Sequence, residues 1–265
     1  MLPARVLTVV GLLSLAAACD SQAPTGPSGA TPITATTLAI TGPDAVLTNV
    51  STAYDATATF SDGRTQTGTT VWASSNPGIA SVDAIGHVEG LTHGSTTLTA
   101  TYVGRSASKT VRVVNNYGGS WVGKYEVDVC DGLPGWCDDA GWAAFSISLE
   151  VSQSGTDQSQ IRAKFRLPNV LSAERWVSIE GSVTPDGRLR LAGSSELTDR
   201  SGRIWATFQV SGWDTDLSGP DAMTGRWEYR LSSVPTYRPP YNGYHQSELT
   251  MTRTSTGAPT TSAVH

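Results

Sequence analysis

The residues with the most distinctive chemistry in this chain are its three cysteines, Cys19, Cys130 and Cys137. Cys130 and Cys137 are separated by six residues, so they are close enough along the chain to form a disulfide in an oxidising compartment. The alternative is a metal site, but two thiols without a neighbouring histidine leave a zinc site incomplete. We therefore expect a disulfide between Cys130 and Cys137 if the chain is exported.

The start of the chain indicates export. Arg5 is followed by an apolar run, residues 6–18, that is too short to span a bilayer and ends in small residues suited to a signal peptidase, so residues 1–18 are predicted to be a signal peptide. The segment Leu15-Ala16-Ala17-Ala18-Cys19 resembles the lipobox of bacterial lipoproteins, although Ala16 stands where that family most often has leucine. The resemblance implies that Cys19 becomes the lipidated first residue, whose acyl chains hold the protein on a membrane. Ordinary cleavage that leaves a free thiol is the alternative.

Residues that could form a catalytic site are sparse. A nucleophile for acyl transfer needs a base within hydrogen-bond reach, and His245 is the one histidine between residues 119 and 253. The sequence has no nucleophile elbow, phosphate-binding loop or metalloprotease helix. Four acids surround the cysteine pair, but the separation that a glycosidase requires between its two carboxylates cannot be read from sequence. We expect a protein without enzymatic activity and without a cofactor. The four acids are Asp128, Asp131, Asp138 and Asp139.

One acidic segment has a spacing that could bind a metal ion. Asp214, Asp216 and Asp221 are spaced like the start of a calcium loop, and Gly219 permits a tight turn. Gly225 occupies the twelfth position, where such a loop has a glutamate. We therefore prefer an ordinary acidic turn over a calcium site.

Three basic residues form a regular pattern. Arg162, Lys164 and Arg166 alternate with apolar residues and therefore share one face of a predicted strand. A solvated face explains them, and a contact with an anionic glycan or lipid is the alternative.

The elements that must position these residues are strands. Charged residues make up 15% of the chain, threonine, serine and valine dominate the long polar stretches, and no segment shows a sustained helical period. The predicted fold class is therefore all-β. The formal net charge is −5, and it becomes −6 when Arg5 leaves with the signal, with 17 basic against 23 acidic residues. Such an acidic chain is a poor binder of nucleic acid.

The first predicted domain covers residues 34–115. Before it, residues 19–33 are rich in alanine, proline, serine, threonine and glycine, and we expect a disordered tether there; residues 254–265 form a similar flexible tail. Seven short strands in the domain predict an immunoglobulin-like sandwich. These strands are Thr37–Thr41, Thr52–Phe60, Thr69–Ala73, Ile79–Val82, His87–Leu91, Ser95–Tyr102 and Ser108–Val114.

Four motifs follow one another in this domain. They are Val71-Trp72-Ala73-Ser74-Ser75-Asn76-Pro77, Ile79-Ala80-Ser81-Val82, Gly86-His87-Val88-Glu89-Gly90-Leu91 and Gly94-Ser95-Thr96-Thr97-Leu98-Thr99-Ala100. In this order they resemble the bacterial immunoglobulin-like group 2 domain. The resemblance implies a β-sandwich of surface proteins, sometimes of intimin-type and invasin-type adhesins and often a spacer, without catalytic residues. From its surroundings, Trp72 is expected in the core, with sugar stacking as the alternative, and His87 and His93 are expected at the surface.

The second predicted domain covers residues 119–253, where apolar and polar residues alternate in eight strands. These strands are Trp121–Val129, Ala143–Gln153, Gln160–Leu167, Arg175–Thr184, Arg188–Ser194, Arg203–Gly212, Met223–Leu231 and Gln246–Arg253. Short turns between them favour a closed antiparallel up-and-down barrel, with an open sandwich as the alternative. The opening Gly119-Ser120-Trp121-Val122-Gly123 and the closing Leu249-Thr250-Met251-Thr252-Arg253 loosely resemble lipocalin-like and avidin-like barrels, which implies an architecture and no ligand residues.

Aromatic residues in or beside the predicted loops are the candidate binding residues of this domain. On an exposed rim they suit stacking against a sugar or an apolar ligand, but tryptophans near strand ends also plug barrels, and we prefer the plug. The loop before the last strand is stiffened by prolines and suits either recognition or passive packing on the barrel end. The candidates are Trp136, Trp142, Trp213, Tyr237, Tyr241 and Tyr244.

Together these features predict a non-catalytic, lipid-anchored protein of the cell envelope, with the immunoglobulin-like domain as a spacer and the barrel outermost. Adhesion or carbohydrate binding is the preferred function. The alternatives are a small-molecule-binding protein that uses the barrel interior and a structural envelope component. The expected partners are the membrane, through the lipid anchor, and a glycan, a surface protein or a small apolar ligand. The sequence leaves open whether the protein faces the periplasm or the cell surface.

Overall fold

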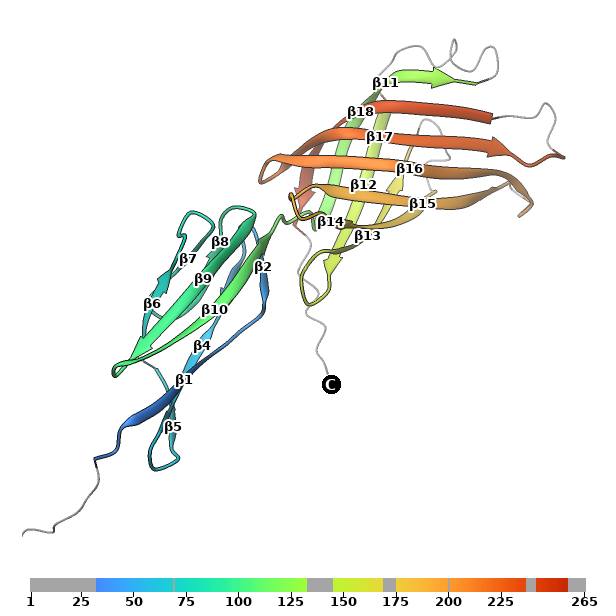
Figure 1. The fold of residues 1–265 in the computed structure, drawn as a ribbon. Coiled ribbons are helices and arrows are strands. Elements are labelled where there is room, and N and C mark those ends of the chain that lie inside the picture. Colours follow the sequence, from blue (N-terminus) through green and yellow to red (C-terminus); the bar gives the residue numbers. More distant parts are fainter. Residues whose placement is uncertain are drawn as a thin grey trace, which may run out of the picture. The chain divides into compact units, whose positions relative to one another are not determined.

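The computed structural model describes residues 32–68, 70–132, 145–168, 175–199, 201–236 and 242–256. Every regular element in these ranges is a β-strand, which confirms the all-β prediction (Figure 1). The described residues include no helix long and apolar enough to cross a membrane. The predicted signal peptide, Cys19 and most of the predicted tether lie outside the described residues.

Ten strands form the immunoglobulin-like part of the described chain. They are β1 (Ala35–Thr41), β2 (Ala45–Leu47), β3 (Ser51–Ala53), β4 (Asp55–Phe60), β5 (Thr65–Thr67), β6 (Val71–Ser74), β7 (Ala80–Val82), β8 (His87–Gly90), β9 (Gly94–Tyr102) and β10 (Arg105–Val114). Their sheets have the orders β1-β4-β5, β2-β10-β9-β6 and β3-β8-β7. Strand β2 runs parallel to β10, and the other pairs are antiparallel.

A buried tyrosine explains why one predicted strand is two strands in the structure. Tyr54 interrupts the run predicted as Thr52–Phe60; its hydroxyl donates to the carbonyl of Pro43 at 2.7 Å and its N–H donates to the carbonyl of Gly86 at 2.9 Å. The chain changes sheets at this point, because β3 pairs with β8 and β4 pairs with β1. Strands β2 and β5 were not predicted, because the three residues of β2 are all apolar and those of β5 are all polar, so neither shows a period of two.

The core of this part contains the residues that the alternating pattern points inward. Leu98 and Ala100 of β9 are fully buried. Trp72 is partly buried and packs against the core, as predicted. The buried residues that form this core are Val46, Tyr54, Ala80, Val88, Leu98, Val111 and Val113.

Eight further strands close into an antiparallel barrel, which confirms the predicted architecture and excludes the open sandwich (Figure 1). They are β11 (Gly119–Asp131), β12 (Phe145–Ser154), β13 (Gln160–Arg166), β14 (Val177–Val183), β15 (Leu189–Thr198), β16 (Ile204–Gly219), β17 (Ala222–Ser233) and β18 (Asn242–Ser255). Each strand pairs with the next along the chain, and β18 pairs with β11.

A bulge makes β16 longer than predicted. The pattern predicts that this strand ends at Gly212, whereas it continues to Gly219. The pairing of β16 with β17 shifts between Val210 and Gly212, so Phe208 and Val210 point inward before the shift and Trp213 points inward after it. Inward-facing residues have even numbers before the bulge and odd numbers after it. In the sequence this break in the period of two looks like the end of a strand.

An up-and-down barrel has its connections alternately at two ends. We call the end where β11 begins at Gly119 and β18 ends at Ser255 the linker end; its hairpins are short. We call the end where β11 ends at Asp131 the loop end. The long connections of the barrel leave this loop end, and they include the one between Asp131 and Phe145.

Candidate functional site

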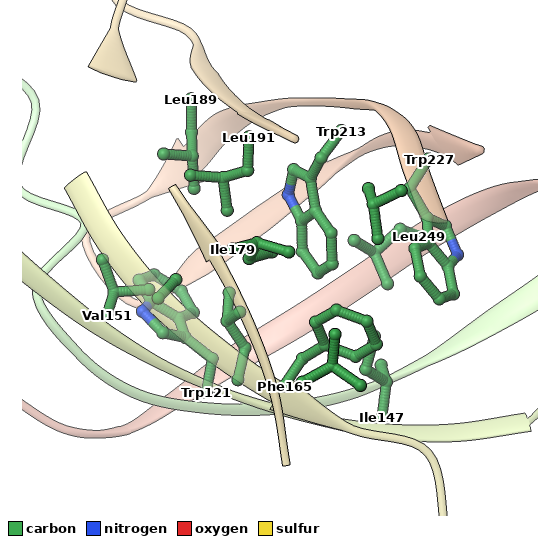
Figure 2. Close-up of a cluster of buried hydrophobic side chains, with 14 of the residues drawn as sticks. Trp121, Ile147, Val151, Phe165, Ile179, Leu189, Leu191, Trp213, Trp227 and Leu249 are labelled. Atoms are coloured by element: carbon green, nitrogen blue, oxygen red, sulfur yellow. The ribbon is translucent and has the colours of Figure 1, made fainter. Parts of the chain in front are cut away.

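The interior of the barrel is filled by side chains (Figure 2). Trp213, Trp227 and Phe165 are all at most 1% exposed. Their ring centroids lie 5.5 Å apart for Trp213 and Trp227, 5.6 Å for Phe165 and Trp227, and 6.2 Å for Phe165 and Trp213. Aliphatic residues such as Ile179 and Leu249 pack around them. The described interior is therefore a close-packed core.

The linker end of the barrel is plugged by Tyr117, which belongs to the linker, residues 115–118. Tyr117 is fully buried and its hydroxyl donates to the carbonyl of Gly187 at 2.9 Å. Gly187 has a φ of 89°, a left-handed conformation that glycine adopts without strain. The indole N–H of Trp121 donates to the carbonyl of Tyr117 at 2.8 Å. Burial raises the pKa of the Tyr117 hydroxyl, so the plug stays neutral.

Gln153 connects the linker to the barrel wall. This side chain is 5% exposed, and its Oε1 accepts a hydrogen bond from the N–H of Tyr117 at 2.9 Å. Its Nε2 donates to the carbonyl of Asn115 at 2.9 Å and to the carbonyl of Gln158 at 2.7 Å. The amide thus pairs three buried or partly buried backbone groups that have no strand partner.

Arg253 binds the other side of the linker. Its side chain is 4% exposed and donates from Nη1 to the carbonyl of Gly118 at 3.0 Å and from Nη2 to the carbonyl of Asn116. Its Nε lies 3.5 Å from the carboxylate of Asp221. Burial lowers the pKa of Arg253, and the charge of Asp221 opposes that effect. The linker is therefore held by two buried polar side chains, Gln153 and Arg253.

A buried polar cluster lies toward the loop end. His245 is 2% exposed; its Nδ1 lies 2.9 Å from the hydroxyl of Tyr229 and its Nε2 lies 3.4 Å from Sγ of Cys130. Burial lowers the pKa of His245, so the imidazole is neutral near pH 7. The cluster positions the sulfur of Cys130 and fixes the ring of Tyr229. The pattern predicted a strand that begins only at Gln246, so the inward position of His245 was missed.

The structure does not bring the described members of the predicted aromatic site together. Trp213 lies in the core, where its Nε1 donates to the hydroxyl of Thr215 at 3.3 Å, so the idea of an exposed rim is wrong for this residue and the plug interpretation fits it. Tyr244 lies on β18 between two inward-facing residues and therefore points outward, with Cζ of Arg230 at 5.7 Å from its ring centroid. The other candidates, Trp136, Trp142, Tyr237 and Tyr241, lie outside the described residues, as does Cys137.

The predicted acidic turn is the end of β16 and a hairpin, so its carboxylates do not converge. Asp214 forms ion pairs with Arg188 and, at 3.3 Å, with Arg190. Asp221 pairs with Arg253 across the hairpin. Within the described residues, no group of three or more histidines, cysteines or acids is arranged to hold a metal ion. The carboxylates of Asp214 and Asp221 form ion pairs with arginines of the barrel instead.

Sequence reasoning missed Tyr117, Gln153 and Arg253, the three residues that hold the linker. Gln153 and Arg253 do carry a faint signal, because each is a long polar residue near the end of an otherwise alternating strand. Their partners are distant in the sequence: Gln153 is 36 residues from Tyr117, and Arg253 is 135 residues from Gly118. Such partners can be identified only in three dimensions.

Comparison with solved structures gives matches to the S-layer protein SbsC. The structure of its domains 5-6 has 17% sequence identity and a TM-score of 0.29, over 82% of this chain and 98% of that chain. The structure of its domains 4-9 also has 17% identity and a TM-score of 0.29, over 82% of this chain and 31% of that chain. These low scores carry no conclusion about function.

No curated protein sequence matches the chain. Family models give a match in the first half of the chain, in the segment that contains β1 to β10. Residues 34–113 match the model of the bacterial Ig-like domain (group 2), which confirms the family resemblance of this segment and indicates a protein of the cell surface or envelope.

Proposed function

We propose that this chain is a non-catalytic, lipid-anchored envelope protein whose barrel binds a glycan or a surface protein through its loop end. In this proposal Cys19 carries the lipid, residues 20–33 form the tether, and the Ig-like domain is a spacer. The observation that carries the proposal is the closed linker end, where Tyr117 plugs the barrel and Arg253 holds the linker. The loop end and the outer wall are the surfaces of the barrel that remain for a partner.

The packed interior supports binding at the surface over binding inside the barrel. A small apolar ligand would have to displace side chains such as Phe165 and Trp227, which are fully buried and in contact with each other. The chain connections at the loop end also contain Trp136, Trp142, Tyr237 and Tyr241 by sequence. Aromatic side chains of this kind supply large contact areas at low cost in conformational entropy.

The proposal is tested by sedimentation of residues 20–265, the mature polypeptide without its lipidated Cys19 and called the mature polypeptide below, with envelope fragments of the source bacterium. We expect cosedimentation that is lost when Trp136, Trp142, Tyr237 and Tyr241 are replaced together by serine. The control is Tyr102→Ser, because Tyr102 is a partly exposed aromatic residue of the Ig-like domain. Thermal unfolding confirms that each variant is folded. Equal sedimentation of the quadruple variant and the control would show that the loop end is not the binding surface.

Anchoring has its own test. Cells that express the full chain are labelled with a radioactive fatty acid, and we expect label on the wild type and none on Cys19→Ser. Label on both proteins, or on neither, contradicts lipidation at Cys19.

A further inference from the structure

The outer wall of the barrel carries a groove across β12, β13 and β14. Its volume is about 270 Å³. Its lining combines charged and hydroxyl-bearing side chains from all three strands with the apolar Ala163 and Ile179. The side chains that matter are Glu150, Ser152, Arg162, Lys164, Ser178 and Glu180.

Strand β13 carries three cations on its outward face: Arg162 and Lys164 line this groove, and Arg166 lies two positions beyond it along the strand. Arg162, Lys164 and Arg166 occupy every second position of the strand and so lie about 7 Å apart. Arg162 forms an ion pair with Glu180 at 3.5 Å, and Lys164 forms one with Glu150 at 2.9 Å. Both pairs are well exposed to solvent, so each contributes little to stability.

Arg166 differs from its two neighbours. Among the described residues it has no carboxylate partner and no hydrogen bond, and its Nε is buried without an acceptor. Its contact is with the indole of Trp176, whose ring centroid lies 5.1 Å from Cζ of Arg166 and 4.9 Å from Nζ of Lys164. Trp176 thus holds two cations side by side on an acidic protein. Because Nε is buried, only the Nη groups of this guanidinium can reach a ligand; held in place and without a carboxylate partner among the described residues, they are suited to a carboxylate or a phosphate.

We propose that Arg166, Lys164 and Trp176 bind the anionic groups of an envelope polysaccharide, which runs along the outward face of β13 and past the groove. The regular spacing of the three cations fits a polymer with a repeated carboxylate or phosphate. The hydroxyls of Ser152 and Ser178 and the carboxylates of the groove pair with sugar hydroxyls. The same carboxylates repel a nucleic acid or an anionic lipid surface more strongly than a polysaccharide, because charges are denser on the former and are separated by neutral sugar groups on the latter. This site is independent of the loop aromatics of the proposed function.

The test measures binding of the mature polypeptide, residues 20–265, to three polymers by affinity electrophoresis. Polygalacturonate supplies carboxylates, a poly(glycerol phosphate) supplies phosphates, and dextran is the neutral control. We expect retardation by at least one of the anionic polymers, weakened by salt, and none by dextran. The anionic polymer that binds more tightly identifies the source of the charge.

Variants make the site specific. We expect Arg166→Gln to weaken binding about tenfold, as loss of a charged hydrogen bond does, and Trp176→Leu to weaken it as well. Arg226→Gln is the matched control, because Arg226 is an exposed arginine on strand β17 and its replacement removes the same charge from another part of the barrel. This variant should bind the polymers like the wild type. Thermal unfolding checks the fold of each variant. The proposal would be overturned if Arg166→Gln and Arg226→Gln weakened binding equally, or if neither anionic polymer bound more tightly than dextran. The quadruple loop variant should retain binding to the anionic polymer.

Discussion

The guanidinium carbon of Arg253 lies 4.5 Å from the ring centroid of Trp121, inside the linker end of the barrel. The same guanidinium binds the carbonyls of Asn116 and Gly118, while the Trp121 indole binds the carbonyl of Tyr117. The first and last strands of the barrel therefore hold the linker between them. The loop end of the barrel lies at the opposite ends of these two strands.

Replacing Arg253 by alanine should destabilise the protein by about 3 kcal/mol. The loss combines the cation–π contact with Trp121 and two linker carbonyls left without a donor. Urea unfolding followed by tryptophan fluorescence measures the effect. Arg203→Ala is the control, because Arg203 is exposed, and it should change the free energy of unfolding by less than about 0.5 kcal/mol. Similar effects of the two substitutions would show that Arg253 does not hold the linker.

Replacing Gln153 by alanine should lower the free energy of unfolding by about 2 kcal/mol, because it leaves the N–H of Tyr117 and the carbonyls of Asn115 and Gln158 unpaired. Hydrogen exchange of the Tyr117 amide should accelerate in the same variant. Gln209→Ala, at an exposed outward position of β16, should leave both measurements unchanged. An unchanged Tyr117 exchange rate in Gln153→Ala contradicts the assigned bond.

Protein stability should fall as the pH drops below about 6.5 because of His245. Burial lowers its pKa below the ordinary value of 6.5, so below pH 6.5 the unfolded state binds a proton that the folded state does not. The stabilisation is thus complete above pH 6.5 and is lost as the pH falls toward the folded pKa. Urea unfolding at several pH values should give a shallower dependence for His245→Asn than for the wild type. Parallel curves for the two proteins would contradict this assignment.

The predicted disulfide between Cys130 and Cys137 should contribute about 2.5 kcal/mol, the loop-entropy value for so short a ring. Thiol titration of the unfolded mature polypeptide should find no free thiol before reduction and two after it. Cys137→Ser should match the stability of the reduced wild type. Two free thiols without reductant would exclude the bond, and the 3.4 Å contact between Cys130 and His245 would then join a thiol and an imidazole.

The eight barrel strands could be predicted because each has one buried face, which gives a period of two. Tyr229, for example, alternates correctly with its neighbours on β17. Trp213 could not be placed, because the bulge near Gly212 reverses which residues point inward. His245 was missed for a different reason: a polar residue on the inward face breaks the apolar pattern, although Tyr229 and Cys130 satisfy it in space.

The partners in the linker contacts could not be predicted from the sequence. Gln153 and Arg253 are ordinary polar residues in sequence, and their roles depend on backbone groups brought close only when the barrel closes. The Ig-like segment shows the opposite case. Its motifs around Trp72 lie close together in sequence, so local patterns were enough to identify the family.

A barrel that is full inside can bind a partner only at its surface. The most direct test is a titration of the tryptophan fluorescence of the mature polypeptide with envelope polysaccharides and with small apolar molecules, since Trp213 and Trp227 report on the core. We expect a saturable change with a polysaccharide and no saturable change with any apolar molecule. A saturable change with an apolar molecule at a ratio of one per chain would contradict the account and move the binding site into the barrel.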